Sequence, residues 1–186
     1  CRLNNDTGER IYNPLFKYSE FYRFYNALIH DERLLRVMQE KGYRGKFFLH
    51  THHKVQLKDF TGNDIIEVMQ QGIDYQEEFR NNALLVTDFS SVAFDFAYLK
   101  KPVIYAQFDK DTFFQGQVYS EGYFDYERDG LGPVCYDYES TIEALIHAIE
   151  NDCVLDPLYD ERGNAFYRWF DQDNCKRVYD EIRRLH

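Results

Sequence analysis

Residues 83–91 read Ala83-Leu84-Leu85-Val86-Thr87-Asp88-Phe89-Ser90-Ser91. The apolar residues before Thr87 predict a buried strand, and the small polar residues after it predict a turn. A short helix is expected from Val92 to Lys100, and residues 102–106, Pro-Val-Ile-Tyr-Ala, predict the next strand. Consecutive parallel strands need a crossover helix of this kind, so the stretch indicates a parallel sheet.

The alternation of strands and helices continues on both sides of this stretch. Apolar runs predict further strands at residues 46–50 and 65–68, and a short one at 134–136. Apolar stripes predict helices over residues 19–29, 31–41, 140–151 and 171–185, with Gly42 ending the second and a capping box of Ser140 and Glu143 opening the third. Residues 3–14 are polar and are expected to form a loop. The pattern predicts an α/β fold, a Rossmann-like parallel sheet with helices on both faces, as one domain over residues 1–186.

Composition excludes several classes of protein. The 32 acidic and 22 basic side chains give a net charge of −10, which argues against binding nucleic acid or an anionic bilayer by charge. The 44% of hydrophobic residues exclude a disordered chain, and no apolar run is long enough for a transmembrane helix. The four cysteines lack metal-ligand spacing, so we expect free thiols. Because the chain opens with Cys1 and a polar segment, we expect a piece of a longer protein without a signal peptide.

The turn from Thr87 to Ser91 is the first candidate site. The first backbone N–H groups of a helix lack partners inside the helix and carry partial positive charge, and Ser90 and Ser91 add hydroxyl donors. The turn can therefore cradle a phosphate, or its side chains can simply cap the helix. Asp95, one helical turn after Ser91, can accept hydrogen bonds from a ligand hydroxyl or serve only as an acid favoured near a helix start.

His50 is the second candidate, because it ends a predicted strand at the sheet edge where ligands of α/β proteins bind. Its imidazole can donate to a phosphate or transfer a proton, and a structural or solvated histidine is the alternative. His52 and His53 are interpreted as surface residues, and no metal site is expected. Residues 130–133, Gly-Leu-Gly-Pro, predict a turn that could shape a base pocket.

The run from Leu84 to Tyr105 closely resembles the signature of the CDP-glycerol glycerophosphotransferases, the teichoic-acid polymerase and primase enzymes. Phe108-Asp109, residues 121–126 (Glu-Gly-Tyr-Phe-Asp-Tyr), Gly132-Pro133 and the strand ending at His50 fit as well, so the resemblance covers about residues 19–150. Two positions depart from the family: Thr51 stands where proline usually follows the histidine, and Arg2 follows Cys1 where Trp-Arg is usual.

The resemblance implies the C-terminal, donor-binding half of a GT-B type enzyme. Such an enzyme transfers glycerol phosphate from CDP-glycerol to a hydroxyl of a polymer or lipid-linked acceptor and releases CMP, on the inner face of the cell membrane. By similarity His50 would be catalytic, and Ser90, Ser91 and Asp95, together with Thr87 in the same turn, would bind the donor. The expected partners are the donor, the acceptor and the protein's own N-terminal domain, which holds a further essential histidine; no cofactor is expected.

Two other functions remain open at this stage. A GT-B sugar-nucleotide glycosyltransferase or epimerase would also place a nucleotide diphosphate at a helix start in its C-terminal domain. A non-catalytic binding module is the alternative from a different class, because an acidic, tyrosine-rich surface suits a protein partner.

Overall fold

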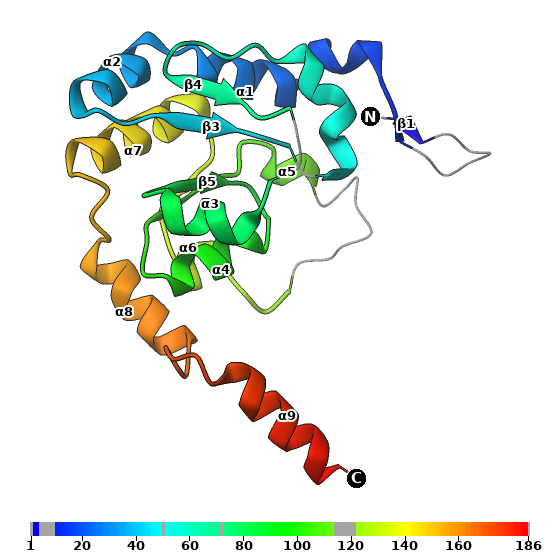
Figure 1. Cartoon of the computed structure of the whole chain (residues 1–186). Coiled ribbons are helices and arrows are strands. Elements are labelled where there is room, and N and C mark those ends of the chain that lie inside the picture. The colour runs from blue at the N-terminus through cyan, green and yellow to red at the C-terminus, as the bar shows by residue number, and fades with distance from the viewer. Residues whose placement is uncertain (1, 4–9, 50, 71–72, 114–121, 186) are drawn as a thin grey trace.

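The computed structural model describes residues 2–3, 10–49, 51–70, 73–113 and 122–185 (Figure 1). Its strands are short: β1 (Arg2–Leu3), β2 (Arg10–Ile11), β3 (Gly45–Phe47), β4 (Ile66–Val68), β5 (Leu85–Thr87), β6 (Val103–Ala106) and β7 (Val134–Cys135). The α-helices are α1 (Glu20–Ile29), α2 (Glu32–Lys41), α3 (Tyr75–Asn81), α4 (Val92–Tyr98), α5 (Lys110–Phe113), α6 (Tyr126–Asp129), α7 (Tyr138–Glu150), α8 (Pro157–Phe166) and α9 (Asn174–Arg184). Residues Pro14–Tyr18 and Thr51–Asp59 form 3₁₀ helices.

The strands form small sheets rather than one long sheet. Strands β5, β6 and β7 pair in parallel in that order, with Val86 opposite Ile104 and Ala106 opposite Cys135. Strands β3 and β4 form a separate parallel pair, and β1 and β2 pair antiparallel where a loop was expected. The predicted mixed α/β fold with parallel pairing is confirmed. The continuous Rossmann-like sheet is not seen among the described strands, which have two to four residues each and so offer few ladder positions.

Helices cover both faces of the β5–β6–β7 sheet. Side chains alternate along a strand, and in β6 Ile104 packs into the larger core cluster with residues of α2 and α7. Val103 and Tyr105 point the other way and pack with Ala93 and Phe96 of α4. Figure 1 shows α7 and α4 on opposite sides of β5. This arrangement buries β6 completely and fixes the end of the strand from both faces.

Capping side chains set several helix boundaries. Ser19 caps α1 by accepting a hydrogen bond from the Tyr22 N–H, and Gly42 ends α2 in the left-handed conformation with φ of 75°. The predicted capping box at the start of α7 is wrong. The helix begins two residues earlier, at Tyr138, because Asp137 is its N-cap and forms the box with Ser140.

The C-terminal helices extend away from the body of the molecule (Figure 1). Helix α8 was not predicted; Asp156 caps it and Pro157 occupies its first turn. Aromatic rings tie the end of α8 to α4, with Phe166 stacked on Phe94 at a centroid distance of 5.3 Å. Helix α9 confirms the predicted final helix, and none of its residues is buried. Over the described part of the chain, each helix is too short or too polar to span a membrane.

Candidate functional site

The carboxyl ends of three parallel strands define the candidate site. Strands β5, β6 and β7 end at Thr87, Ala106 and Cys135, and polar residues follow each of these ends. Ligands of open α/β sheets bind at this edge, because the loops after parallel strands meet there. The loops carry Asp88 to Ser91 after β5, Gln107 to Asp109 after β6, and Tyr136 and Asp137 after β7.

The turn between β5 and α4 is held partly by its own side chains. The Ser90 N–H donates to the Asp88 carboxylate at 3.1 Å, and the Val92 N–H approaches the Ser90 Oγ at 3.5 Å, the limit of a hydrogen bond. Ser91 is the N-cap residue of α4, but its side chain makes no capping bond and it is exposed. Capping by Ser90 is therefore weak, and phosphate binding by Ser91 remains compatible with the geometry.

The other predicted site residues lie around this turn or outside the described residues. Thr87 is half-buried in β5 and pairs with Tyr105 of β6. Asp95 is exposed on α4, one turn after Ser91, and lies near Tyr167. Burial raises the pKa of Tyr167, and the nearby Tyr105 and Asp95 raise it further. The strand that was predicted to end at His50 ends earlier, at Phe47. His50 itself is outside the described residues, so its catalytic role stays a prediction.

Asp109 adds a second carboxylate to this edge, beside the Asp88 of the motif. Burial raises the pKa of Asp109, and the charges of Asp88 and Glu20 raise it further. Tyr25 of α1 lies beside the same two carboxylates. Burial is the largest cause of its raised pKa, and the charges of Asp88 and then Asp109 add smaller contributions. Carboxylates repel a phosphate but accept hydrogen bonds from hydroxyls. Asp109 was noted in the sequence only as part of the resemblance, and its half-buried position beside Asp88 was not predicted.

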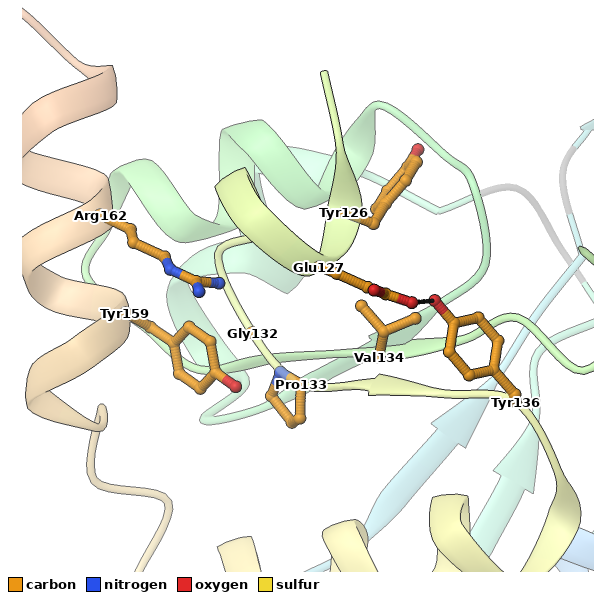
Figure 2. Close-up of a pocket in the computed structure, with 8 residues that line it drawn as sticks. All are labelled: Tyr126, Glu127, Gly132, Pro133, Val134, Tyr136, Tyr159 and Arg162. Atoms are coloured by element: carbon orange, nitrogen blue, oxygen red, sulfur yellow. Dashed lines mark hydrogen bonds between the residues drawn. The ribbon is translucent and has the colours of Figure 1, made fainter. Parts of the chain in front are cut away.

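Two cavities lie next to each other at the end of β7. The first has a volume of about 360 Å³ and lies between α6, β7 and α8 (Figure 2); its lining residues are Tyr126, Glu127, Gly132, Pro133, Val134, Tyr136, Tyr159 and Arg162. The second has a volume of about 270 Å³, and its lining residues are Gln107, Phe108, Lys110, Asp111, Glu127 and Tyr136. Glu127 and Tyr136 border both cavities, and the Tyr136 hydroxyl donates to the Glu127 carboxylate at 2.5 Å.

Basic groups stand on either side of this Glu127–Tyr136 pair. The Lys110 ammonium donates to the Tyr136 hydroxyl at 3.2 Å and lies 4.0 Å from the Glu127 carboxylate. Arg162 of α8 donates to the Gly130 carbonyl at 3.1 Å, which fixes the turn before β7 against that helix. The strand-end rule that selected His50 and Thr87 would have selected Gln107 and Tyr136 as well, had it been applied to β6 and β7.

The turn from Gly130 to Pro133 serves close backbone packing. A Cβ atom added to Gly132 would lie 1.8 Å from the Val103 carbonyl oxygen, and one added to Gly130 would lie 2.0 Å from the Tyr126 carbonyl oxygen. Gly132 and Pro133 also line the larger cavity. Whether this turn shapes a base pocket stays a prediction.

No metal centre is visible in the described ranges, where no three His, Cys, Asp or Glu side chains are grouped to hold an ion. Cys135, Cys153 and Cys175 are free thiols, as predicted, and the first two are buried. Cys1 lies outside the described residues.

Comparison with known proteins assigns this sequence pattern to a family. The family model described as "CDP-Glycerol:Poly(glycerophosphate) glycerophosphotransferase" matches residues 2–184. The minor teichoic acid biosynthesis protein GgaB of Bacillus subtilis is 39% identical over 178 residues, which cover 96% of this chain and 19% of that protein. The teichoic acid poly(glycerol phosphate) polymerase of the same organism is 32% identical over 173 residues, covering 86% of this chain and 22% of the polymerase.

A third relative, the teichoic acid glycerol-phosphate transferase of Staphylococcus aureus, is 30% identical over 124 residues, covering 66% of this chain and 30% of the transferase. The chain thus spans between about a fifth and a third of the length of these relatives. No solved structure matches it.

Proposed function

Because the chain belongs to the CDP-glycerol:poly(glycerophosphate) glycerophosphotransferase family, we propose that it is the donor-binding part of a teichoic-acid enzyme. The enzyme transfers glycerol phosphate from CDP-glycerol to a hydroxyl of a polymer or lipid-linked acceptor and releases CMP. The observation that carries this proposal is the family match, which runs from residue 2 to residue 184 without relying on one short motif.

The position of the matched turn supports the proposal. The turn from Thr87 to Ser91 follows β5 at the carboxyl edge of the parallel sheet, where nucleotides bind in α/β folds. The Ser91 side chain is exposed and makes no capping bond, so it is available to a diphosphate. The acidic residues nearby, Asp88 and Asp109, suit hydroxyl groups rather than phosphates.

The proposed reaction is an in-line displacement at phosphorus. The acceptor oxygen forms a bond to the phosphorus that carries glycerol, the bond from this phosphorus to the bridging oxygen breaks, and CMP leaves with the bonding electrons. Ser90, Ser91 and the start of α4 hold the diphosphate, and Asp95 accepts a hydrogen bond from a donor hydroxyl. His50 donates to the phosphoryl oxygens or to the departing CMP, and a base outside this chain takes the acceptor proton. Positioning and charge stabilisation supply most of the rate enhancement in such reactions.

The remaining parts of the proposal concern the whole protein. The chain would be the C-terminal half of a GT-B fold and would pack against its own N-terminal domain, which contributes to the acceptor site. The enzyme would work in the cytoplasm at the inner face of the membrane. Since the chain carries a net charge of −10, the attachment would come from other parts of the protein.

Isothermal titration calorimetry on the 186-residue chain tests the proposal. CDP-glycerol and CMP are expected to bind, whereas UDP-N-acetylglucosamine is expected to give no heat; CDP-ribitol measures the choice of polyol. The chain alone is expected not to transfer glycerol phosphate. Binding of the UDP-sugar in place of CDP-glycerol would reject the proposal in favour of a sugar-nucleotide enzyme, and no binding of either would favour a non-catalytic module.

A further inference from the structure

Gln107 carries a buried side-chain amide. The residue is 1% exposed, and neither its side-chain oxygen nor its side-chain nitrogen has a hydrogen-bond partner among the described residues. Its backbone is well placed, because its N–H donates to the Cys135 carbonyl at 2.8 Å and continues the ladder from β6 to β7. Buried amides nearly always have partners, since leaving one unpaired is costly. The unpaired state therefore needs an explanation.

The side chain of Gln107 lies on the face of the sheet that carries the smaller cavity. Residues two apart on a strand share a face, so Gln107 follows Tyr105, whose ring contacts that of Tyr126 in α6. The 270 Å³ cavity is lined by Gln107 together with residues of α5 and α6 and the end of β7. Gln107 is thus a lining residue of the smaller cavity at the carboxyl end of the central strand, and its amide atoms are buried immediately behind that lining.

The lining favours a small hydroxylated ligand over a nucleobase or a phosphate. Both aromatic rings in this lining already have partners: Phe108 is stacked on Phe24 at 3.9 Å, and the Lys110 ammonium lies 4.9 Å from the centroid of the Tyr136 ring. The carboxylates of Asp111 and Glu127 outnumber the Lys110 ammonium, which already lies 4.0 Å from Glu127, so this lining disfavours phosphate and can accept hydrogen bonds from hydroxyls. An amide presents a donor and an acceptor side by side, and a vicinal diol offers the matching acceptor and donor, since each hydroxyl can do both.

We propose that Gln107 binds the vicinal diol of a polyol phosphate in this cavity and thereby selects the polyol. The proposal rests on the function proposed above, and it adds a specificity-determining residue to it. The diol can arrive from two sources, the glycerol end of CDP-glycerol or the terminal glycerol of the acceptor, and the experiment separates them.

Gln56 and Gln107, both buried in the described part of the chain, provide a matched pair of variants. Gln56 is 0% exposed but fully paired: its Oε1 accepts from the Asn13 N–H at 2.7 Å, and its Nε2 donates to Asp59 at 3.0 Å. Methionine has nearly the same shape as glutamine and no strong hydrogen-bonding group. Gln107→Met is therefore expected to raise the melting temperature of the unliganded chain by about 2–4 °C, while Gln56→Met lowers it by at least as much.

Calorimetry then tests the ligand, with CDP-glycerol, CMP and glycerol 3-phosphate as probes. Gln107→Met is expected to weaken CDP-glycerol binding at least tenfold and to leave CMP binding within twofold of the wild type, a selectivity change that a purely structural role would not cause. A loss for glycerol 3-phosphate alone would also support the proposal and assign the diol to the acceptor. Gln107→Glu, which loses the donors and keeps the acceptors, gives a second measurement with the same expectation should the methionine variant fold poorly.

Three results would overturn the proposal. One is unchanged binding of CDP-glycerol and glycerol 3-phosphate in both Gln107 variants. Another is an equal loss for CMP and CDP-glycerol, which would assign Gln107 to the nucleotide. In either case the proposed function stands, provided that the wild type binds CDP-glycerol. If the wild type binds none of the three probes, the proposed function fails and this inference fails with it.

Discussion

Gly132→Ala tests whether the close contact between the turn before β7 and strand β6 holds the site together. The added Cβ atom would lie 1.8 Å from the Val103 carbonyl oxygen, and ordinary contact begins at 3.4 Å, so the backbones must separate by about 1.6 Å. The atoms in the way are backbone atoms of Val103 in the buried strand β6, so no flexible side chain can move aside to make room. The whole displacement therefore falls on the β6–β7 ladder.

The cost follows from the hydrogen bonds beside the contact. The Tyr105 N–H donates to the Pro133 carbonyl at 2.9 Å, and the Gln107 N–H donates to the Cys135 carbonyl at 2.8 Å. A separation of about 1.6 Å takes both beyond the hydrogen-bond range. Each bond contributes about 1 kcal/mol net, and the buried groups left unpaired cost more, so we expect a loss of about 3 kcal/mol in the free energy of unfolding. For a chain of this size the melting temperature falls by about 6–12 °C.

Gly163→Ala is the matched control. Gly163 lies inside α8, and a Cβ atom there meets nothing within 4 Å. Alanine in a helix is favoured over glycine by about 0.5–1 kcal/mol, so this variant is expected to gain stability. Urea denaturation followed by circular dichroism measures both variants. A Gly132→Ala protein within 1 kcal/mol of the wild type would show that the turn can move away from β6 at little cost, and the reasoning would be wrong.

Three further predictions concern the site and its acidic groups. Ser91→Ala is expected to weaken CDP-glycerol binding about tenfold in calorimetry without lowering the melting temperature, because the Ser91 side chain makes no capping hydrogen bond. The control Ser19→Ala removes the capping hydrogen bond of α1, so it should cost about 1 kcal/mol of stability and leave binding unchanged. The pKa of Asp31 is lowered to about 2, and the hydrogen bond from Arg33 is the largest cause. The stability that this carboxylate contributes is therefore present above its ordinary pKa of 3.8 and is lost as the pH falls toward 2. The urea midpoints at pH 5 and pH 2.5 should differ less in Asp31→Asn than in the wild type. Burial raises the pKa of Asp109, so donor affinity should rise as the pH rises through that pKa and the carboxylate becomes able to accept hydrogen bonds from the donor hydroxyls. Calorimetry on Asp109→Asn should give a flatter pH profile.

The sequence predicted the elements whose apolar pattern is unbroken. Strands β5 and β6 were found because apolar runs stop sharply at Thr87 and Gln107, and α1 was found from its stripe and its Ser19 cap. Helix α3 was missed because only Tyr75 and Phe79 form an apolar pair in it; the Asp74 cap and the Lys46–Glu78 ion pair stabilise it. An ion pair between residues far apart in the sequence, such as Lys46 and Glu78, cannot be predicted from the local sequence pattern of the helix.

The candidate site was predicted only in part for a related reason. A motif of contiguous residues identifies the β5–α4 turn, since all of its side chains come from one segment. The cavities at β7 combine Gln107, Lys110, Glu127 and Tyr136, and α8 adds Arg162. These residues come together only through the pairing of β6 with β7 and the packing of α6 and α8 on that edge. Helix α8 itself was missed, so its contribution to the site could not be foreseen.

The distribution of charge along the carboxyl edge gives the proposed donor one orientation. At β5 the edge offers the exposed Ser91 hydroxyl and the start of a helix, which suit an anion, while the Asp88 carboxylate of the same turn is engaged by the Ser90 N–H. At β6 and β7 it offers Asp109, the Gln107 amide and Glu127, which suit uncharged hydroxyls. A donor bound the other way would bring its diphosphate against Asp109 and Glu127. One pair of unit charges 4 Å apart costs about 4 kcal/mol near a protein surface, and the Lys110 ammonium beside Glu127 reduces that cost. A cost of only about 1.4 kcal/mol is already tenfold in affinity, so the charges along this edge would fix which end of CDP-glycerol faces the acceptor.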